Sequence, residues 1–147
     1  RFAAWYFASR GDLSELEELL ARLPSSEIWV REYRALLAAE RNDWVLASEL
    51  YHSVHGGRPT WRTALNASIS TFGAGRAEAA RVLLDEAERR ARDAGLPQAS
   101  AAVFTAIARS SRDHRRATAA IETALRLDPT NTRALLLRSQ LESTTGY

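Results

Sequence analysis

The chain of 147 residues has a net charge of only +2, and 46% of its residues are apolar. It contains no cysteine, which excludes disulfide bonds and thiolate metal sites. No apolar run approaches the roughly 20 residues that a transmembrane helix needs, so we expect no membrane insertion. The small net charge gives no strong overall attraction to nucleic acid or anionic lipid. The composition is that of an ordinary folded domain.

Hydrophobic residues recur at helical spacing along the chain, and no segment alternates convincingly as a strand does. The fold class is therefore predicted to be all-α. The predicted helices cover residues 2–9, 13–22, 27–40, 44–52, 61–72, 76–93, 98–110, 114–127 and 132–142.

Capping residues and prolines mark the boundaries between these helices. Asp12 and Glu15 have the spacing of a capping box. Further predicted N-caps are Ser26, Asp43, Thr60, Asp113 and Asn131. The prolines at the helix-pair boundaries are Pro24, Pro59, Pro97 and Pro129. They separate the helices in pairs rather than interrupting them.

A template of small and large residues recurs along the chain. It is clearest at Ala117, Ile121 and Ala124, which are followed by Asp128 and Pro129. Earlier copies are Ala80-Leu84-Ala87, Ala47-Tyr51-Val54 and, loosely, Leu16-Leu20-Leu23. The first residues of the four copies are 31, 33 and 37 positions apart, a mean of about 34. A small residue beside a large one on one helical face lets a neighbouring helix approach closely.

On these residues the chain resembles the tetratricopeptide repeat family. The resemblance implies a right-handed α-α superhelix, or solenoid, of about four helical hairpins plus one extra helix. Residues 1–147 would form one array with approximate repeats 1–26, 27–60, 61–97 and 98–131 and a partial repeat 132–147. The glycine of the family's first-helix signature is absent throughout.

Both ends of the chain indicate a window from a longer array. Phe2, Trp5, Tyr6 and Phe7 make the first helix aromatic, whereas a solenoid normally ends with a polar-faced cap. At the other end, residues 132–142 form a first helix without its partner, and Gly146 falls at the expected hairpin turn. We therefore expect neighbouring repeats on both sides.

In this family the first helices line an inner groove that holds a protein or peptide partner. The positions that match are Trp29, Glu32, Arg62, Asn66, Arg109 and Arg133. Arginine can bind a carboxylate of an acidic partner segment bidentately, although arginines that merely solvate the groove fit the pattern as well. Trp29 and Trp61 lie where a side chain can enter either the groove or the core. The resemblance implies a noncatalytic protein-interaction scaffold.

A second candidate surface is a basic cluster beside Arg109. Its members are Arg112, His114, Arg115 and Arg116, at a turn and the start of a helix. The helix dipole disfavours cations there, and Asp113 offsets part of the charge. An acidic segment, a phosphate or an anionic polysaccharide would suit this cluster, and so would plain solvation.

Sequence motifs for catalysis are absent. There is no glycine-rich phosphate loop, nucleophile elbow or zinc-protease motif, so we expect neither catalytic residues nor a cofactor. The nearest approach to a metal site is Glu49-x2-His52-x2-His55, which lacks the second copy that a carboxylate-bridged metal site needs. His55 precedes two glycines and is expected to lie outside the helix, so no metal is predicted.

Two other functions compete with the scaffold. A related helical-hairpin repeat binds RNA, but we find neither the matching base-reading residues nor the continuous basic groove that it needs, and we expect no nucleic acid. Alternatively, the repeats stiffen or dimerise a larger enzyme. All 20 basic residues are arginine, which is typical of a GC-rich bacterial genome. Similar bacterial arrays occur in envelope and exopolysaccharide-export assemblies and in cytoplasmic regulators, so periplasm and cytoplasm both stay open.

Overall fold

Residues 1–145 are described by a computed structural model, and within them the chain forms nine α-helices and no strand. The helices are α1 (Phe2–Arg10), α2 (Leu13–Ala21), α3 (Ile28–Glu40), α4 (Trp44–Gly57), α5 (Trp61–Gly73), α6 (Ala77–Ala94), α7 (Pro97–Ser110), α8 (His114–Leu127) and α9 (Thr132–Thr145). The predicted all-α class is confirmed. Every predicted helix is present, and most boundaries agree to within two residues.

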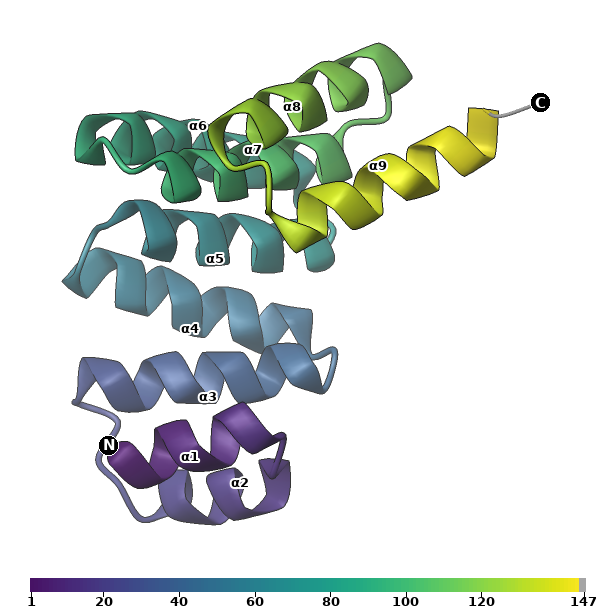
Figure 1. Ribbon diagram of the computed structural model, residues 1–147. Coiled ribbons are helices and arrows are strands. Elements are labelled where there is room, and N and C mark those ends of the chain that lie inside the picture. Colours follow the sequence, from purple (N-terminus) through teal and green to yellow (C-terminus); the bar gives the residue numbers. More distant parts are fainter. Residues whose placement is uncertain (146–147) are drawn as a thin grey trace.

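Helices α3, α4 and α5 lie one above the other in the order of the sequence, α6, α7 and α8 lie beyond them, and α9 turns back below α8 (Figure 1). Each helix packs mainly against the helices before and after it, and α7 also contacts α5 and α9. Buried apolar side chains form successive clusters, from α1–α3 through α3–α5 and α5–α7 to α7–α9. The core is thus a series of seams between successive helices.

Small and large residues alternate in these seams. On α6, Ala80 and Ala87 are fully buried and Leu84 is only 5% exposed. The same pattern is buried on α4, at Ala47, Tyr51 and Val54, and on α8, at Ala117, Ile121 and Ala124. The alanines let the neighbouring backbones approach while the larger side chains fill the space between them. The recurring template of the sequence therefore marks the contact faces of α4, α6 and α8.

Several helix starts use the predicted caps. Thr60 forms a capping box with Thr63, and the Asn131 side chain accepts a hydrogen bond from the Ala134 amide at 3.0 Å. Asp43 and Asp113 also accept backbone amides. The prediction for Asp12 was wrong, because its carboxylate makes no capping bond and instead lies 3.4 Å from Arg10 Nε. The prediction for Ser26 was wrong by one residue, since Glu27 occupies the N-cap position.

The end of α4 departs from the prediction. The helix continues five residues beyond His52, to Gly57, so His55 lies within it. His55 is held there by two side chains of neighbouring helices: its Nε2 lies 2.6 Å from Glu86 of α6 and its Nδ1 2.7 Å from Thr63 Oγ1 of α5. These tertiary contacts extend the helix through a glycine-rich segment whose local propensity is poor.

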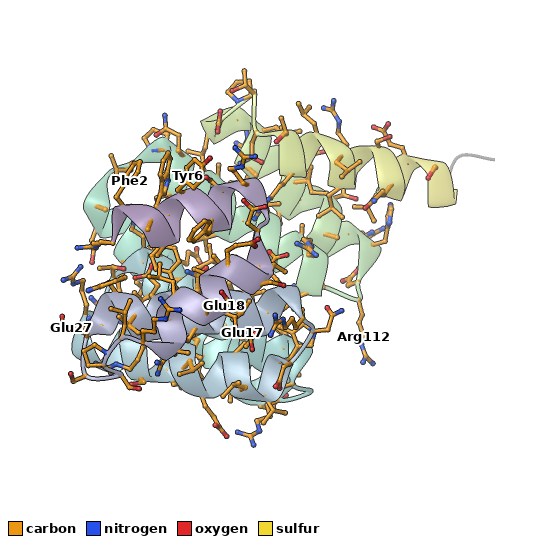
Figure 2. All side chains as sticks on the ribbon, turned by 90° about the horizontal axis from the view of Figure 1, so that it is seen from below. Phe2, Tyr6, Glu17, Glu18, Glu27 and Arg112 are labelled. Carbon is orange, nitrogen blue, oxygen red and sulfur yellow. The ribbon has the colours of Figure 1, made fainter. Side chains whose placement is uncertain are left out.

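The N-terminal helix α1 exposes large aromatic side chains. On α1, Phe2 and Trp5 are 73% and 55% exposed, and Figure 2 shows Phe2 and Tyr6 on the surface at this end.

Gly146, which was expected at a hairpin turn, lies outside the described residues. None of the described helices combines the length and apolar character needed to cross a membrane.

Candidate functional site

One open groove, with a volume of about 570 Å³, extends across alternate helices of the stack. Its walls come from α3, α5, α7 and α9, with two aromatic side chains of α4 between them. The lining residues are Leu36, Ala39, Glu40, Trp44, Tyr51, Asn66, Ile69, Ser70, Arg109, Arg133, Leu136, Leu137 and Gln140. The groove is therefore a joint product of five helices.

Helical periodicity explains why these residues share one surface. On α9, Arg133, Leu136, Leu137 and Gln140 occupy positions i, i+3, i+4 and i+7, which lie along one face of a helix. Asn66, Ile69 and Ser70 repeat the first three of these positions on α5, and Ala39 and Glu40 follow Leu36 in the same way on α3. Helices α3, α5 and α9 thus each turn one stripe towards the groove, and α7 adds Arg109.

Tyr51 supplies a polar group to the groove from α4. The residue is only 7% exposed. Burial, together with the nearby carboxylates of Glu32 and Glu40, raises the pKa of Tyr51 to about 12. At neutral pH the phenol therefore stays protonated and can donate a hydrogen bond.

Charge is unevenly distributed along the groove. Glu32 and Glu40 lie on α3, near Tyr51, whereas Arg109 and Arg133 lie on α7 and α9. Within the described residues, neither arginine takes part in an ion pair, and both are exposed. The groove therefore has an acidic α3 side and a basic α7–α9 side, with apolar residues between them.

A second cavity, of about 410 Å³, adjoins the groove and shares Trp44, Ile69 and Arg109 with it. Phe72 and Ala106 complete its apolar wall. Gly73 belongs to the same wall, and any larger residue there would collide with Trp44, because a Cβ atom would lie 2.5 Å from the indole ring. The close approach of α5 to the start of α4 therefore requires a glycine at position 73.

The structure separates the predicted groove residues into two groups. Asn66, Arg109 and Arg133 line the groove, and Glu32 lies close enough to act on the pKa of Tyr51. Arg62 instead stacks over Trp61, with its guanidinium carbon 5.2 Å from the ring centroid.

The sequence left Trp29 either in the groove or in the core, and the structure places it in the core. It packs against the buried cluster of α1–α3 and meets Tyr33 edge to face, with ring centroids 6.3 Å apart. Trp61 likewise packs against the buried cluster of α5–α7. These first-helix tryptophans therefore fill seams between helices.

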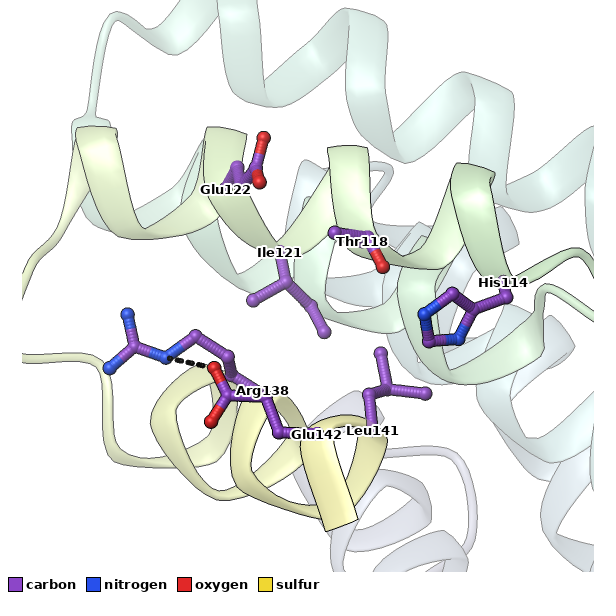
Figure 3. A pocket seen from close by; sticks show the side chains of 7 residues that line it. All are labelled: His114, Thr118, Ile121, Glu122, Arg138, Leu141 and Glu142. Carbon is purple, nitrogen blue, oxygen red and sulfur yellow. Dashed lines mark ion pairs between the residues drawn. The ribbon is translucent and has the colours of Figure 1, made fainter. Parts of the chain in front are cut away.

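The basic cluster is divided by the structure. Arg112, Arg115 and Arg116 are exposed, and the Asp113 carboxylate accepts the Arg115 amide at 3.0 Å. His114 lines a small cavity of about 150 Å³ between α8 and α9, where it lies near Leu141 (Figure 3). His114 is exposed like the three arginines, and it differs from them in lining this cavity.

The histidines of the Glu49-x2-His52-x2-His55 segment have other partners. His52 Nδ1 lies 2.7 Å from the Ser48 carbonyl oxygen, and His55 bridges Thr63 and Glu86. Among the described residues, no group of three or more His, Cys, Asp or Glu side chains is placed to hold a metal ion. The His55 bridge is a contact between three helices.

Sequence reasoning missed most of the apolar part of the groove. Ile69, Leu136 and Tyr51 were not chosen, because apolar residues on an amphipathic helix are expected in the core. The available signal was their spacing, since Ile69 and Leu136 each lie three residues after a predicted groove residue, Asn66 or Arg133. Extending each predicted position by one helical turn would have found Ile69 and Leu136, but not Tyr51, because α4 carries no predicted groove residue.

Comparisons of this chain with protein-family models, with curated proteins and with solved structures found no match.

Proposed function

We propose that the chain is a noncatalytic protein-interaction scaffold, built as a right-handed superhelix of degenerate tetratricopeptide-like hairpins, which holds a segment of a partner protein. The observation that carries this proposal is the groove, because four alternate helices contribute residues to one continuous surface. A surface built from several rigid helices suits the recognition of an extended or helical peptide.

The groove contains the kinds of residue that anchor a bound segment. Trp44 offers aromatic area and Tyr51 a phenol at the groove wall, and Arg109 and Arg133 offer charges that no carboxylate of the described chain neutralises. A few aromatic and arginine contacts supply most of the binding free energy in typical interfaces. We therefore expect the affinity to depend on these four side chains more than on the total contact area.

The charge of the groove favours a polypeptide over RNA. Glu40 lines the groove and Glu32 acts on Tyr51 beside it, so a phosphate backbone following the groove would pass two carboxylates. Nucleic-acid binding depends on a run of cations matched to successive phosphates. A peptide with acidic residues near α7 and α9 and a basic residue near α3 would match the charges along the whole groove.

The test begins with selection of phage-displayed random peptides on the immobilised chain, followed by fluorescence anisotropy of the enriched peptides in solution. The groove variant replaces Arg109 and Arg133 with alanine. A matched control replaces Arg89 and Arg92, two exposed arginines on α6 that lie outside the groove, so both variants lose the same charge. Circular dichroism checks that both variants are folded.

We expect the groove variant to bind the enriched peptides at least about tenfold more weakly, a change of 1.4 kcal/mol, and the control to bind as the unmodified chain does. Equal weakening in both variants would mean that binding reflects only net charge. Failure to enrich any peptide, or unchanged binding by the groove variant, would contradict the proposal.

A further inference from the structure

The cavity beside the groove differs from the groove in the character of its walls. Trp44, Phe72, Ile69 and Ala106 line an open, largely apolar space of about 410 Å³, and Arg109 lines both this space and the groove. Aromatic walls favour a flat ring, because offset and edge-to-face ring pairs add to the stabilisation from buried area. A space of this volume is large enough for one large side chain.

One buried polar group of this wall lacks a hydrogen-bond partner within the described residues. Ser68 is 1% exposed, and its hydroxyl forms no hydrogen bond with any part of the chain that the structure describes. Its neighbours on α5 behave differently, since the hydroxyls of Ser70 and Thr71 donate to the carbonyl oxygens of Asn66 and Ala67. A buried hydroxyl without a partner is costly, so a ligand that supplies one is favoured.

Arg109 favours a ligand that carries a negative charge beside the side chain in the cavity. It borders both the cavity and the groove, and no ion pair among the described residues neutralises it. A carboxylate next to the inserted side chain would reach this guanidinium as the chain leaves the cavity. The guanidinium can hold a carboxylate through two parallel hydrogen bonds.

We propose that this cavity is the anchor pocket for a tyrosine of the partner segment, flanked by an acidic residue. The inference rests on the proposed function, because the cavity opens into the same groove. The tyrosine ring lies between the walls formed by Trp44 and Phe72, its hydroxyl pairs with Ser68, and the neighbouring carboxylate pairs with Arg109. A phenol both donates and accepts hydrogen bonds, so it can satisfy a serine hydroxyl in either direction.

The chemistry predicts discrimination between tyrosine and phenylalanine. Phenylalanine would fill the same apolar space but leave the Ser68 hydroxyl unpaired in a site from which the peptide excludes water. We expect the tyrosine form of a bound peptide to bind about tenfold more tightly than its phenylalanine form. Replacing Ser68 with alanine removes the orphaned hydroxyl, and the two forms should then bind within about a factor of two of each other.

The experiment sequences the peptides enriched by phage selection on the unmodified chain and then on Ser68→Ala and Arg109→Ala. The enriched peptide and its phenylalanine and alanine forms are titrated by fluorescence anisotropy. Thr105→Val is the matched control, because Thr105 is also buried but its hydroxyl already donates to the Ala101 carbonyl oxygen on its own helix. N-acetyltyrosinamide is titrated alone to test for a pocket that serves free small molecules.

Support would consist of enriched tyrosines with acidic neighbours, loss of the tyrosine preference in Ser68→Ala, and loss of the acidic preference in Arg109→Ala. Thr105→Val should keep both preferences. Enriched peptides without tyrosine, or a tyrosine preference that survives Ser68→Ala, would overturn the anchor pocket while leaving the scaffold intact. Failure to enrich any peptide would overturn the scaffold as well. Binding of N-acetyltyrosinamide as tight as that of the peptide would overturn the assignment to a partner segment.

Discussion

The middle of the stack and its N-terminal end bury their helices to different extents. In the middle, α6 contacts both α5 and α7 and buries Ala80, Leu84, Ala87 and Ala91. At the N-terminal end, Ala4 is the one residue of α1 that is buried, whereas Phe2 and Trp5 are largely exposed. A helix inside the stack has two neighbours to pack against, and α1 has far less cover. Because buried apolar area supplies most of the stabilisation, we expect the region from α5 to α7 to resist local unfolding more than α1 does.

Removing a large residue from the central seam should have the largest effect. Leu84→Ala deletes a side chain that is 5% exposed, and we expect it to lower the free energy of unfolding by about 2–5 kcal/mol. Val82→Ala on the same helix changes a residue that is 69% exposed and should cost no more than about 0.5 kcal/mol. Urea titration followed by circular dichroism measures both. Equal effects would show that α6 does not pack through the Leu84 face.

Enlarging a small residue in the same seam should have the second-largest effect on the free energy of unfolding. Ala80 is fully buried between helices, so Ala80→Leu must separate them or distort side chains, at a cost of about 1–3 kcal/mol. The adjacent Ala79 is exposed, and Ala79→Leu should leave the urea midpoint nearly unchanged. If both substitutions were tolerated, the close approach at Ala80 would be wrong.

The His55 bridge gives a smaller effect that depends on pH. Burial acts to raise the pKa of Glu86, but hydrogen bonds from Arg90 and His55 and the charges of these residues outweigh it, so the pKa lies below its ordinary value. Glu86 therefore stabilises the fold above the pKa of an unfolded glutamate, about 4.3, and this contribution is lost as pH falls through the lower, folded pKa.

Glu86→Gln removes the charge of this bridge while keeping its shape. We expect a loss of about 1 kcal/mol at neutral pH, reduced by the partial exposure of the pair, and a difference from the unmodified chain that shrinks below about pH 4. Urea titrations at neutral and acidic pH measure this difference. A gap that widened on acidification would contradict the sign of the shift.

The ion pair between Arg41 and Glu17 should have the smallest effect. Its partners join α2 to the end of α3, and their side chains are 43% and 55% exposed. Solvent screens such a pair, so Glu17→Gln should leave the urea midpoint unchanged within error, even though Arg41 lowers the pKa of Glu17. A loss as large as that of Glu86→Gln would mean that exposure does not control the strength of these contacts.

The sequence alone was sufficient to predict the helices and the helix faces that pack together. These features depend on local periodicity, as at Ala80, Leu84 and Ala87, and on caps such as Thr60, whose partner lies three residues away. Such signals are contained in one or two helical turns. Such features can therefore be predicted without knowledge of the tertiary structure.

The contacts that depend on three helices could not be predicted in the same way. His55 stays helical because Thr63 and Glu86 contact it from α5 and α6, and the sequence around His55 does not indicate these partners. Trp29 and Arg62 lie at first-helix positions similar to those of the groove residues, yet Trp29 packs into a seam and Arg62 stacks on Trp61. Spacing alone defines a face of a helix but not which neighbour that face meets.

We propose that a partner binds across the surface formed by α3, α5, α7 and α9. The most direct test is an NMR titration of the isotope-labelled chain with a peptide enriched by selection, following the backbone amide signals. We predict shift changes concentrated around Asn66, Ile69, Arg109 and Arg133, with the amides on the exposed faces of α2 and α6 unchanged. Changes concentrated on α2 and α6 while the groove signals stay fixed would contradict the account.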